Sequence, residues 1–358
     1  MAKISLCMIV RNEHDTLARC LESARAAVDE IVIVDTGSDD DTKEIARRYT
    51  QRVLDFAWQD DFSLARNFAF SHAQCDFILW LDADDVLEDA AALTAFKQTQ
   101  LDRFDVVMAP YHAGFDAQGK PTFTYYRERL VRRGMGFVWE GAVHEAIVPR
   151  GRIGYADFAV RHAKNHDANP DPQRNLRIYE KLRARGHAFS ARERFYYGRE
   201  LRTAGRFAQA AEQLRSVIAD EQAWLENRIE ACTDLSACLQ AMGDTAGAMR
   251  ALTESFALCT PRPAVACALG QCFLQKDCLE AARFWYEAAL RLHEDERTGA
   301  FVQPEYSGYV PLMQLCVICD RLGETEKARA YNERAGELRP EDPAVLHNRR
   351  YFAGLSER

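Results

Sequence analysis

Three carboxylates lie within four residues of one another, directly after a short apolar run. The run covers residues 77–81, and the carboxylates belong to Asp82, Asp84 and Asp85. Neighbouring carboxylates repel one another unless a cation or hydrogen bonds offset their charge. Mg²⁺ and Mn²⁺ prefer oxygen ligands, and a phosphate group can supply further oxygens. The cluster therefore predicts a divalent-metal site, with strand termination and helix capping by the aspartates as the alternative explanation.

Two other polar clusters follow short apolar runs in the same way. Residues 4–10 precede Arg11-Asn12-Glu13, and residues 31–34 precede a segment that begins at Asp35. Runs this short and this apolar predict strands that are buried on both faces. Helical spacing between them predicts an α/β domain with a largely parallel sheet. Ligands of such sheets bind at the carboxyl ends of the strands, where these clusters would converge.

Composition limits the functional classes. The chain has 358 residues and a net charge of −8, which predicts two domains and argues against nucleic-acid binding by bulk electrostatics. Residues 127–133 nevertheless carry four arginines and predict a local basic patch. We see no signal-peptide pattern and no apolar run long enough to span a membrane. The eleven cysteines are scattered through apolar stretches, which does not indicate a disulfide framework. We therefore expect a cytoplasmic protein.

Four segments together resemble the inverting family-2 glycosyltransferases of the GT-A fold. They occur in the order typical of that family. The segments are SLCMIVRNE (5–13), IVIVDTGSDDDT (31–42), DDFSLARNFAF (60–70) and LWLDADD (79–85). The resemblance implies a UDP-sugar donor and a Mg²⁺ or Mn²⁺ ion. It also implies that Asp82 and Asp84 form the D-x-D motif, with Asp84 ahead of Asp82 as the direct metal ligand.

The same resemblance assigns the donor-binding side chains. Asp35 would hydrogen-bond the uracil, and Arg66 would lie near the phosphates or the base. The backbone that flanks the base would include Val10, Asn12 and Glu13. Asp82 would also contact the donor.

A second unusual stretch, FVWEGAVHEAI, covers residues 137–147. In the resembling family a Glu or Asp in this region deprotonates the acceptor. Glu145 and Glu140 are the candidates here, and we favour Glu145. Trp139 is expected either to stack on a sugar or acceptor ring or to lie in the core.

Two histidines are candidate metal ligands. His162 follows the apolar residues 158–160, where a histidine often completes the metal site of this family. His144 is expected either to support a neighbouring group or to bind the metal. A structural role is the alternative for both, because a single histidine is more often structural.

The second half of the chain predicts helical repeats. Small or turn-forming residues recur at Gly205, Gly243, Asp277 and Gly323, with spacings of 38, 34 and 46 residues. This period resembles tetratricopeptide repeats. The longest spacing predicts an insertion at 295–304. The predicted domains are 1–165 for the α/β GT-A domain, 166–192 for a linker and connecting helix, and 193–350 for all-α tetratricopeptide-like repeats. The C-x-x-C spacing at Cys316 and Cys319 is interpreted as packing.

A family-2 domain fused to such repeats resembles the sublancin-type peptide S-glycosyltransferases, which modify bacteriocins. This implies inverting transfer of a hexose from a UDP-sugar to a peptide side chain or a surface glycan. The repeats would then bind a peptide or protein acceptor or form a homodimer. Residues 143–145 and the donor motifs also resemble transferases of the lipopolysaccharide core, so a core or lipid-linked saccharide is the alternative acceptor. The rival from another class is a non-catalytic repeat scaffold with a degenerate donor domain.

Overall fold

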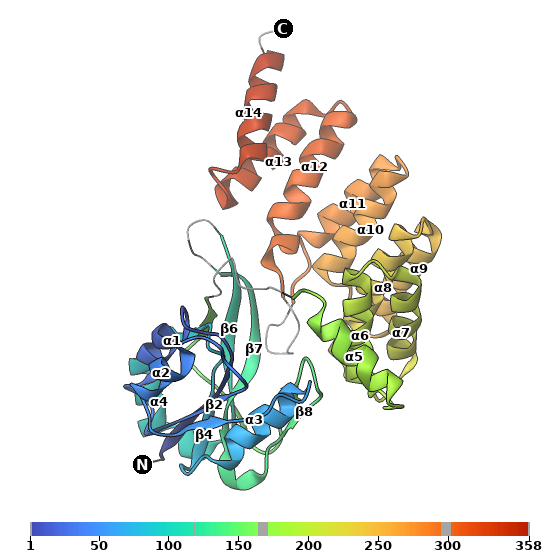
Figure 1. Ribbon diagram of the computed structural model, residues 1–358. Helices are drawn as coiled ribbons and strands as arrows, with labels where there is room; N and C mark the ends of the chain where they lie inside the picture. Colours follow the sequence, from blue (N-terminus) through green and yellow to red (C-terminus); the bar gives the residue numbers. More distant parts are fainter. Residues whose placement is uncertain (1, 117–118, 120, 164–170, 295–301, 357–358) are drawn as a thin grey trace. The chain divides into compact units, whose positions relative to one another are not determined.

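The computed structural model describes residues 2–116, 119, 121–163, 171–294 and 302–356. The chain divides into two compact units, Met1–Ala188 and Phe189–Arg358, which we describe separately (Figure 1). The division falls inside the segment 166–192 that the sequence marks as a connection. In the described part of the chain, no helix combines the length and the apolarity that a membrane crossing requires.

The first unit is built on a mixed sheet with the strand order β3-β2-β1-β4-β7-β6-β11-β5, and β10 pairs with β6. Its strands are β1 (Ile4–Val10), β2 (Glu30–Asp35), β3 (Val53–Asp55), β4 (Phe77–Trp80), β5 (Asp85–Leu87), β6 (Val106–Phe115), β7 (Pro121–Arg132), β10 (Ile153–Tyr155) and β11 (Val160–His162). The predicted parallel sheet is confirmed for β3, β2, β1 and β4. Beyond them the sheet is mixed. β10 and β11 pair parallel with β6, whereas β7 runs antiparallel to β4 and to β6, which it follows closely in the chain, and β5 runs antiparallel to β11.

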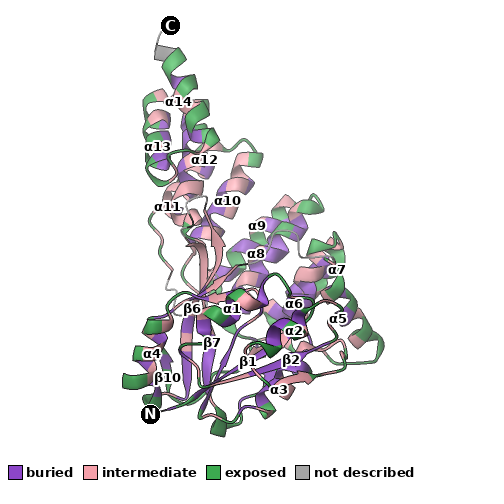
Figure 2. Cartoon of the chain, turned by 60° about the vertical axis from the view of Figure 1, so that its left-hand side comes forward, coloured by how far each residue is buried: buried purple, intermediate pink, exposed green. Residues whose placement is uncertain are grey.

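Alternate side chains of β1 and β4 enter two separate cores. Ile4, Leu6 and Met8 pack on one face with α1 (Leu17–Ala24), α2 (Thr42–Arg47) and α4 (Ala90–Thr99). Cys7 and Trp80 pack on the other face with α3 (Phe62–Ser71) and with the short pair β8 (Trp139–Glu140) and β9 (Ala146–Ile147). This alternation is why unbroken apolar runs form these strands. Figure 2 shows the buried centre of the sheet and the less buried far ends of β6 and β7.

The predicted basic patch at residues 127–133 is wrong. Arg129 is buried and pairs with Asp85 at 2.9 Å, whereas Arg127 pairs with Glu128 and Arg132 pairs with Asp105. These arginines are engaged by carboxylates of the same unit, so they do not form a free basic surface.

The second unit consists of helices that pack in successive pairs (Figure 1). They are α6 (Ala191–Thr203), α7 (Phe207–Ala219), α8 (Leu225–Ala241), α9 (Thr245–Glu254), α10 (Pro263–Gln275), α11 (Leu279–Ala289), α12 (Tyr309–Arg321), α13 (Thr325–Leu338) and α14 (Pro343–Ser356); α5 (Arg174–Ala184) belongs to the first unit. This all-α, tetratricopeptide-like arrangement confirms the predicted fold class. The predicted insertion lies mostly outside the described residues.

The four repeat residues occupy equivalent turns. Gly205, Gly243, Asp277 and Gly323 have φ values of 74°, 82°, 59° and 77°, and each lies two residues before a helix. The alanine that follows in each repeat is fully buried where the helices cross, at Ala210, Ala248, Ala282 and Ala328. The sequence period therefore reports a repeated left-handed turn followed by a close helix contact.

Two packing expectations for the second unit have different outcomes. Cys316 and Cys319 are buried in α12, and all eleven cysteines of the chain are unpaired thiols, in keeping with a packing role. Helical spacing also predicts Tyr196, Tyr197, Trp224 and Trp285 as core residues. Tyr196 and Tyr197 are buried, but Trp224 is 46% exposed at the start of α8.

Candidate active site

Three loops meet at the carboxyl edge of the parallel strands, as their polar clusters predict. The loop after β1 and the loop after β2 are joined by hydrogen bonds. The backbone N–H of Asn12 donates to the Ser38 hydroxyl at 3.0 Å, and the Asp39 N–H donates to the Asn12 side chain at 2.8 Å. The Glu13 N–H donates to the Thr42 hydroxyl at 2.7 Å. These bonds hold the first two loops in one fixed arrangement beside β4.

Asp35 lies at the end of β2 with its side chain 1% exposed. Its Oδ1 accepts hydrogen bonds from the backbone N–H groups of Gly37 and Ser38, each at 2.9 Å. Its Oδ2 is buried and has no hydrogen-bond partner among the described residues. A buried carboxylate oxygen without a donor is costly, so Asp35 has an acceptor available for a ligand N–H or O–H.

The predicted metal ligands Asp84 and His162 come together, and Asp85 joins them. His162 is on β11, which pairs antiparallel with β5, so that its backbone lies opposite Asp85. Its Nδ1 lies 3.7 Å from Asp84 Oδ1 and 3.8 Å from Asp85 Oδ1. In the part of the chain that the structure describes, these three side chains form one of two groups with metal-ligand spacing. Neither Asp82 nor His144 belongs to this group.

The other group is His14, Asp40 and Asp41, and it lies on the loops after β1 and β2. His14 and Asp41 are exposed, and His14 Nδ1 already contacts Asp40 at 2.9 Å. We assign no role to it.

The charges around Asp84 are strongly coupled. Burial raises the pKa of Asp84 and His162 opposes this, while Asp82 and Asp85 add to the increase. The Asp85 carboxylate raises the pKa of His162 against the effect of burial, and Asp84 raises it further. At 3.8 Å this Asp85–His162 contact is longer than a hydrogen bond, so we attribute it to charge attraction. The site therefore has surplus negative charge that favours a cation.

Asp85 differs from Asp82 and Asp84 because both oxygens of its carboxylate already accept hydrogen bonds from side chains of the unit. It is fully buried, and it accepts hydrogen bonds from Arg129 and from the Tyr111 hydroxyl, each at 2.9 Å. Burial alone would raise the pKa of Asp85, but Arg129, His162, the Asp82 backbone N–H and Tyr111 together outweigh burial, and the pKa is lowered. Asp85 thus anchors the base of the site from β5.

Arg66 of α3 connects Asp82 to Glu145. Its guanidinium donates to Asp82 Oδ1 and to Glu145 Oε1, both at 2.6 Å. Burial disfavours the charge of Arg66, but Asp82 and Glu145 more than offset this and raise its pKa. The guanidinium also lies over Trp80 at 5.3 Å and over Trp139 at 4.7 Å from the ring centres. Arg66 is therefore fixed between the D-x-D segment and the 137–147 segment.

The remaining predicted residues differ in burial and in their contacts. Trp139 is 2% exposed and packs edge-on against Trp80 at 4.7 Å, which is the core position that the sequence leaves open. Glu140 is exposed on β8. His144 precedes Glu145 with a φ of 53°, and Val10 is buried in β1 with its carbonyl accepting from the Thr36 N–H at 3.0 Å.

Sequence reasoning missed the support of Asp85 and the position of Arg127. Arg127 lies over Trp80 at 4.8 Å from the ring centre, and it pairs with Glu128 at 3.0 Å. The usable signal is the two-residue spacing of Arg127 and Arg129, which places both on one face of β7.

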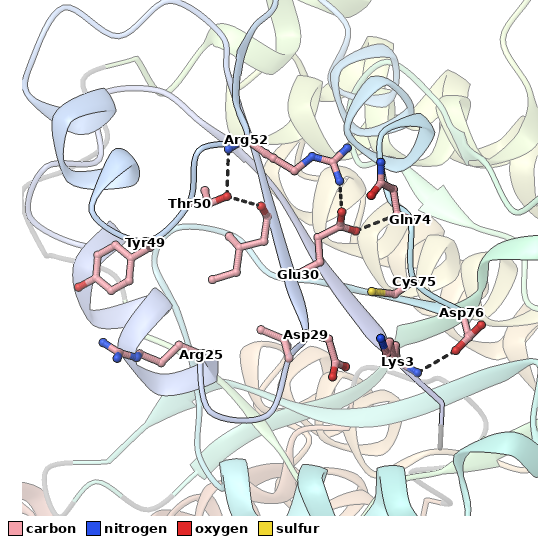
Figure 3. Close-up of a pocket in the computed structure, with 12 residues that line it drawn as sticks. Lys3, Arg25, Asp29, Glu30, Tyr49, Thr50, Arg52, Gln74, Cys75 and Asp76 are labelled. Atoms are coloured by element: carbon pink, nitrogen blue, oxygen red, sulfur yellow. Dashed lines mark hydrogen bonds and ion pairs between the residues drawn. The ribbon is translucent and has the colours of Figure 1, made fainter.

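A cavity lies at the opposite, amino-terminal edge of the strands (Figure 3). Its volume is about 570 Å³. Its charged groups are largely satisfied by one another: Arg52 pairs with Glu30, and the Lys3 N–H donates to Asp76 at 2.9 Å. Since it shares none of the residues at the carboxyl edge, its size alone does not make it the active site.

Comparison with known proteins shows what the first unit is similar to. Residues 5–149 match the family model described as "Glycosyl transferase family 2". This range includes every candidate of the carboxyl edge except His162.

Three curated relatives differ in function and in coverage. The SPbeta prophage-derived glycosyltransferase SunS of Bacillus subtilis is 26% identical over 235 residues, which cover 62% of this chain and 54% of SunS. The lipopolysaccharide core biosynthesis glycosyltransferase LpsC of Rhizobium meliloti is 30% identical over 164 residues, 43% of this chain and 60% of LpsC. A TPR repeat-containing protein of Synechococcus elongatus is 52% identical over 87 residues, 24% of this chain and 22% of that protein. The chain thus spans between 22% and 60% of the length of these relatives.

Proposed function

From the match of residues 5–149 to the family-2 glycosyltransferase model, we propose that the chain is an inverting, metal-dependent transferase of a hexose from a UDP-sugar. The observation that carries the proposal is the convergence, at one strand edge, of an Asp84–His162 pair and an Arg66 that joins Asp82 to Glu145. These are the parts needed to hold a sugar diphosphate and to deprotonate an acceptor.

Asp35 and Arg66 support the donor site. The unpartnered Oδ2 of Asp35 suits the imide N–H of a uracil or a ribose hydroxyl. The loop that carries Asn12 and the loop that carries Ser38 are joined by hydrogen bonds, so they are preorganised beside that atom. Arg66 supplies a buried positive charge near Asp82, suited to a phosphate oxygen.

The donor set fits Mg²⁺ or Mn²⁺. His162 Nδ1 is buried without a hydrogen-bond partner among the described residues, and it faces Asp84 Oδ1 across 3.7 Å. This separation is too long for a hydrogen bond and leaves room for a shared ion. Asp84 and His162 would hold the ion, and Asp82 would approach it from the Arg66 side. When bound, the ion would offset the charge that develops on the departing diphosphate.

Glu145 is the group we assign to the acceptor proton. Inversion requires a base on the face of the sugar opposite the departing diphosphate. Arg66 holds the carboxylate of Glu145 in one orientation through the 2.6 Å hydrogen bond to Oε1, which leaves Oε2 to take the proton. Exposed Glu140 remains the second candidate for this role.

Two acceptor classes agree with the comparisons. Similarity to the glycosyltransferase SunS over 62% of the chain supports sugar transfer, and the resemblance to peptide S-glycosyltransferases favours a peptide side chain as the acceptor. Similarity to LpsC over 43% of the chain favours a core saccharide as the second candidate. Homodimer formation through the repeats and a cytoplasmic location remain predictions.

The proposal is tested by following UDP release from a panel of UDP-hexoses, with Mn²⁺, with Mg²⁺ and with EDTA. We expect at least one sugar to be hydrolysed with a metal present. We expect Asp84→Asn to lower that rate by about 100-fold, because it removes a ligand charge from the site. The exposed Glu44→Gln serves as the matched control and should keep the wild-type rate. Equal rates for Asp84→Asn and the wild type would refute the metal assignment.

A further inference from the structure

The second unit contains a cavity of about 420 Å³ that the proposed sugar transfer does not use. Its walls come mainly from α6, α8, α10 and α12, which are the first helices of successive pairs. The charged residues that line it are Arg199, Arg202, Glu230, Asp234, Arg262 and Glu294. The cavity is therefore a mixed-charge site on one face of the repeat array.

Three acidic residues of α8 point toward this region at four-residue intervals: Glu226, Glu230 and Asp234. This spacing places them on one helix face, where like charges destabilise the helix. The two outer acids are neutralised. Arg262 donates to both oxygens of Glu226 at 2.7 and 2.9 Å, and Asp234 lies 3.3 Å from Arg199 and 3.2 Å from Arg202.

Glu230, in the middle, has no counter-ion. Among the described residues it makes no hydrogen bond and no ion pair, although it lines the cavity between the two arginine-bound acids. The Nε of Arg262 is already engaged by Glu294 at 3.5 Å, so this arginine is not available either. Counting Glu226, three arginines face four carboxylates. The cavity is thus one positive charge short.

The protonation of Glu230 reflects this deficit. Burial raises its pKa to about 7, and Asp234 adds to the increase while Arg199 and Arg262 oppose it. Glu294 also acts to raise it. A cation that entered the cavity would allow Glu230 to ionise and would form a partly desolvated ion pair there.

We propose that this cavity binds a lysine or arginine side chain presented by a peptide segment of a partner protein, with Glu230 as the counter-ion. The surplus carboxylate selects a cation over an anion, because the arginines present are already paired. A single free carboxylate is a poor site for a metal ion, which needs several ligands.

The neutral lining favours a peptide as the source of that cation. Thr233, Gln271, Gln303 and Gln314 line the same cavity. Their amide and hydroxyl groups can both donate to and accept from the N–H and C=O groups of a peptide backbone. This inference does not depend on the proposed sugar transfer.

The test is fluorescence anisotropy with two labelled probes. One is a Gly/Ser peptide that carries three lysines, and the other carries acetyl-lysine at the same positions. We expect the wild-type protein to prefer the lysine peptide by about tenfold in Kd, as one charge-assisted contact would give. We expect Glu230→Gln to reduce this preference to less than about threefold, while the exposed Glu326→Gln keeps it. Circular dichroism of each variant shows whether it is folded.

Three outcomes would overturn the proposal. The first is equal affinity of the wild type for both peptides. The second is an unchanged preference in folded Glu230→Gln, which would place the selectivity elsewhere on this acidic protein. The third is displacement of the lysine peptide by spermidine at equal amine concentration, which would identify a free polyamine rather than a peptide as the ligand.

Discussion

At the residue scale, Arg66 links two carboxylates with different proposed tasks. Its contacts with Asp82 and Glu145 are equal in length, and its guanidinium lies over the Trp80 and Trp139 rings. Arg66 and Glu145 are each only 10% exposed, so a charge left there without its partner is costly, and the same guanidinium also holds Asp82. A phosphate that engaged Arg66 would therefore act on the D-x-D segment and on the candidate base together.

Glu145 and Glu140 provide a matched pair for testing the base. We expect Glu145→Gln to lower kcat for UDP release, with water as acceptor, by about 10²–10⁴-fold, the usual contribution of a general base. The KM for the UDP-sugar should change little, because Glu145 is not assigned to the donor. Glu140→Gln should retain the wild-type kcat, since its side chain is exposed. The reverse result would move the base to Glu140, and full activity of both variants would exclude both candidates.

Glu230 predicts an unusual pH dependence of stability. Its pKa rises from 4.5 in the unfolded chain to about 7 in the fold. The unfolded state therefore loses this proton first, and the contribution of Glu230 to the free energy of unfolding falls as the pH rises from 4.5 to 7. We expect Glu230→Gln, which mimics the neutral form, to be more stable than the wild type by about 3 kcal/mol at pH 8.

Urea unfolding at several pH values measures this difference. It should shrink as the pH falls and should vanish near pH 4, because both states of the wild type then hold the proton. A difference that is independent of pH would show that Glu230 is not a surplus charge.

At the element scale, the repeat turns depend on a left-handed residue before each second helix. Gly243 has a φ of 82° and open space where a Cβ would lie, so Gly243→Ala strains only the backbone. We expect it to lower the free energy of unfolding by about 1 kcal/mol. Asp277 adopts the same conformation at 59° without being a glycine. We expect Asp277→Gly to raise the free energy of unfolding by up to about 1 kcal/mol.

Urea unfolding of the two variants beside the wild type measures both effects. The exposed contact between Asp277 and Arg321 is worth little, so its loss should not reverse the gain. If both substitutions changed the free energy of unfolding in the same direction, this result would contradict the assigned role of the turn.

Many of the strands, helices and turns could be predicted from the sequence because local patterns specify them. The strand predicted at residues 4–10 is Ile4–Val10, and the repeat residues lie in the repeated turn. Pairing across the sheet was not open in the same way. Asp85 is adjacent to the D-x-D motif, yet its role depends on Arg129 of β7 and Tyr111 of β6, which lie 44 and 26 residues away. Such contacts follow from strand order, which no local period contains.

At the scale of the whole molecule, one chain joins the first unit, with the proposed donor site, to the helical second unit, with its own cavity. A partner segment bound by the repeats is tethered to the transferase unit, which raises its effective concentration there. The net charge of −8 favours encounter with basic segments over nucleic acids. This would let substrate choice depend on a part of the chain that takes no part in the chemistry.

Isothermal titration of the full chain with UDP, in Mn²⁺ and in EDTA, tests the central claim most directly. We predict binding at least about tenfold tighter with Mn²⁺, a gain of about 1.4 kcal/mol, and the loss of that difference in Asp84→Asn. Equal affinity in Mn²⁺ and EDTA would contradict the metal site. No binding in either condition would contradict the donor site itself and would leave a repeat scaffold as the better account of this protein.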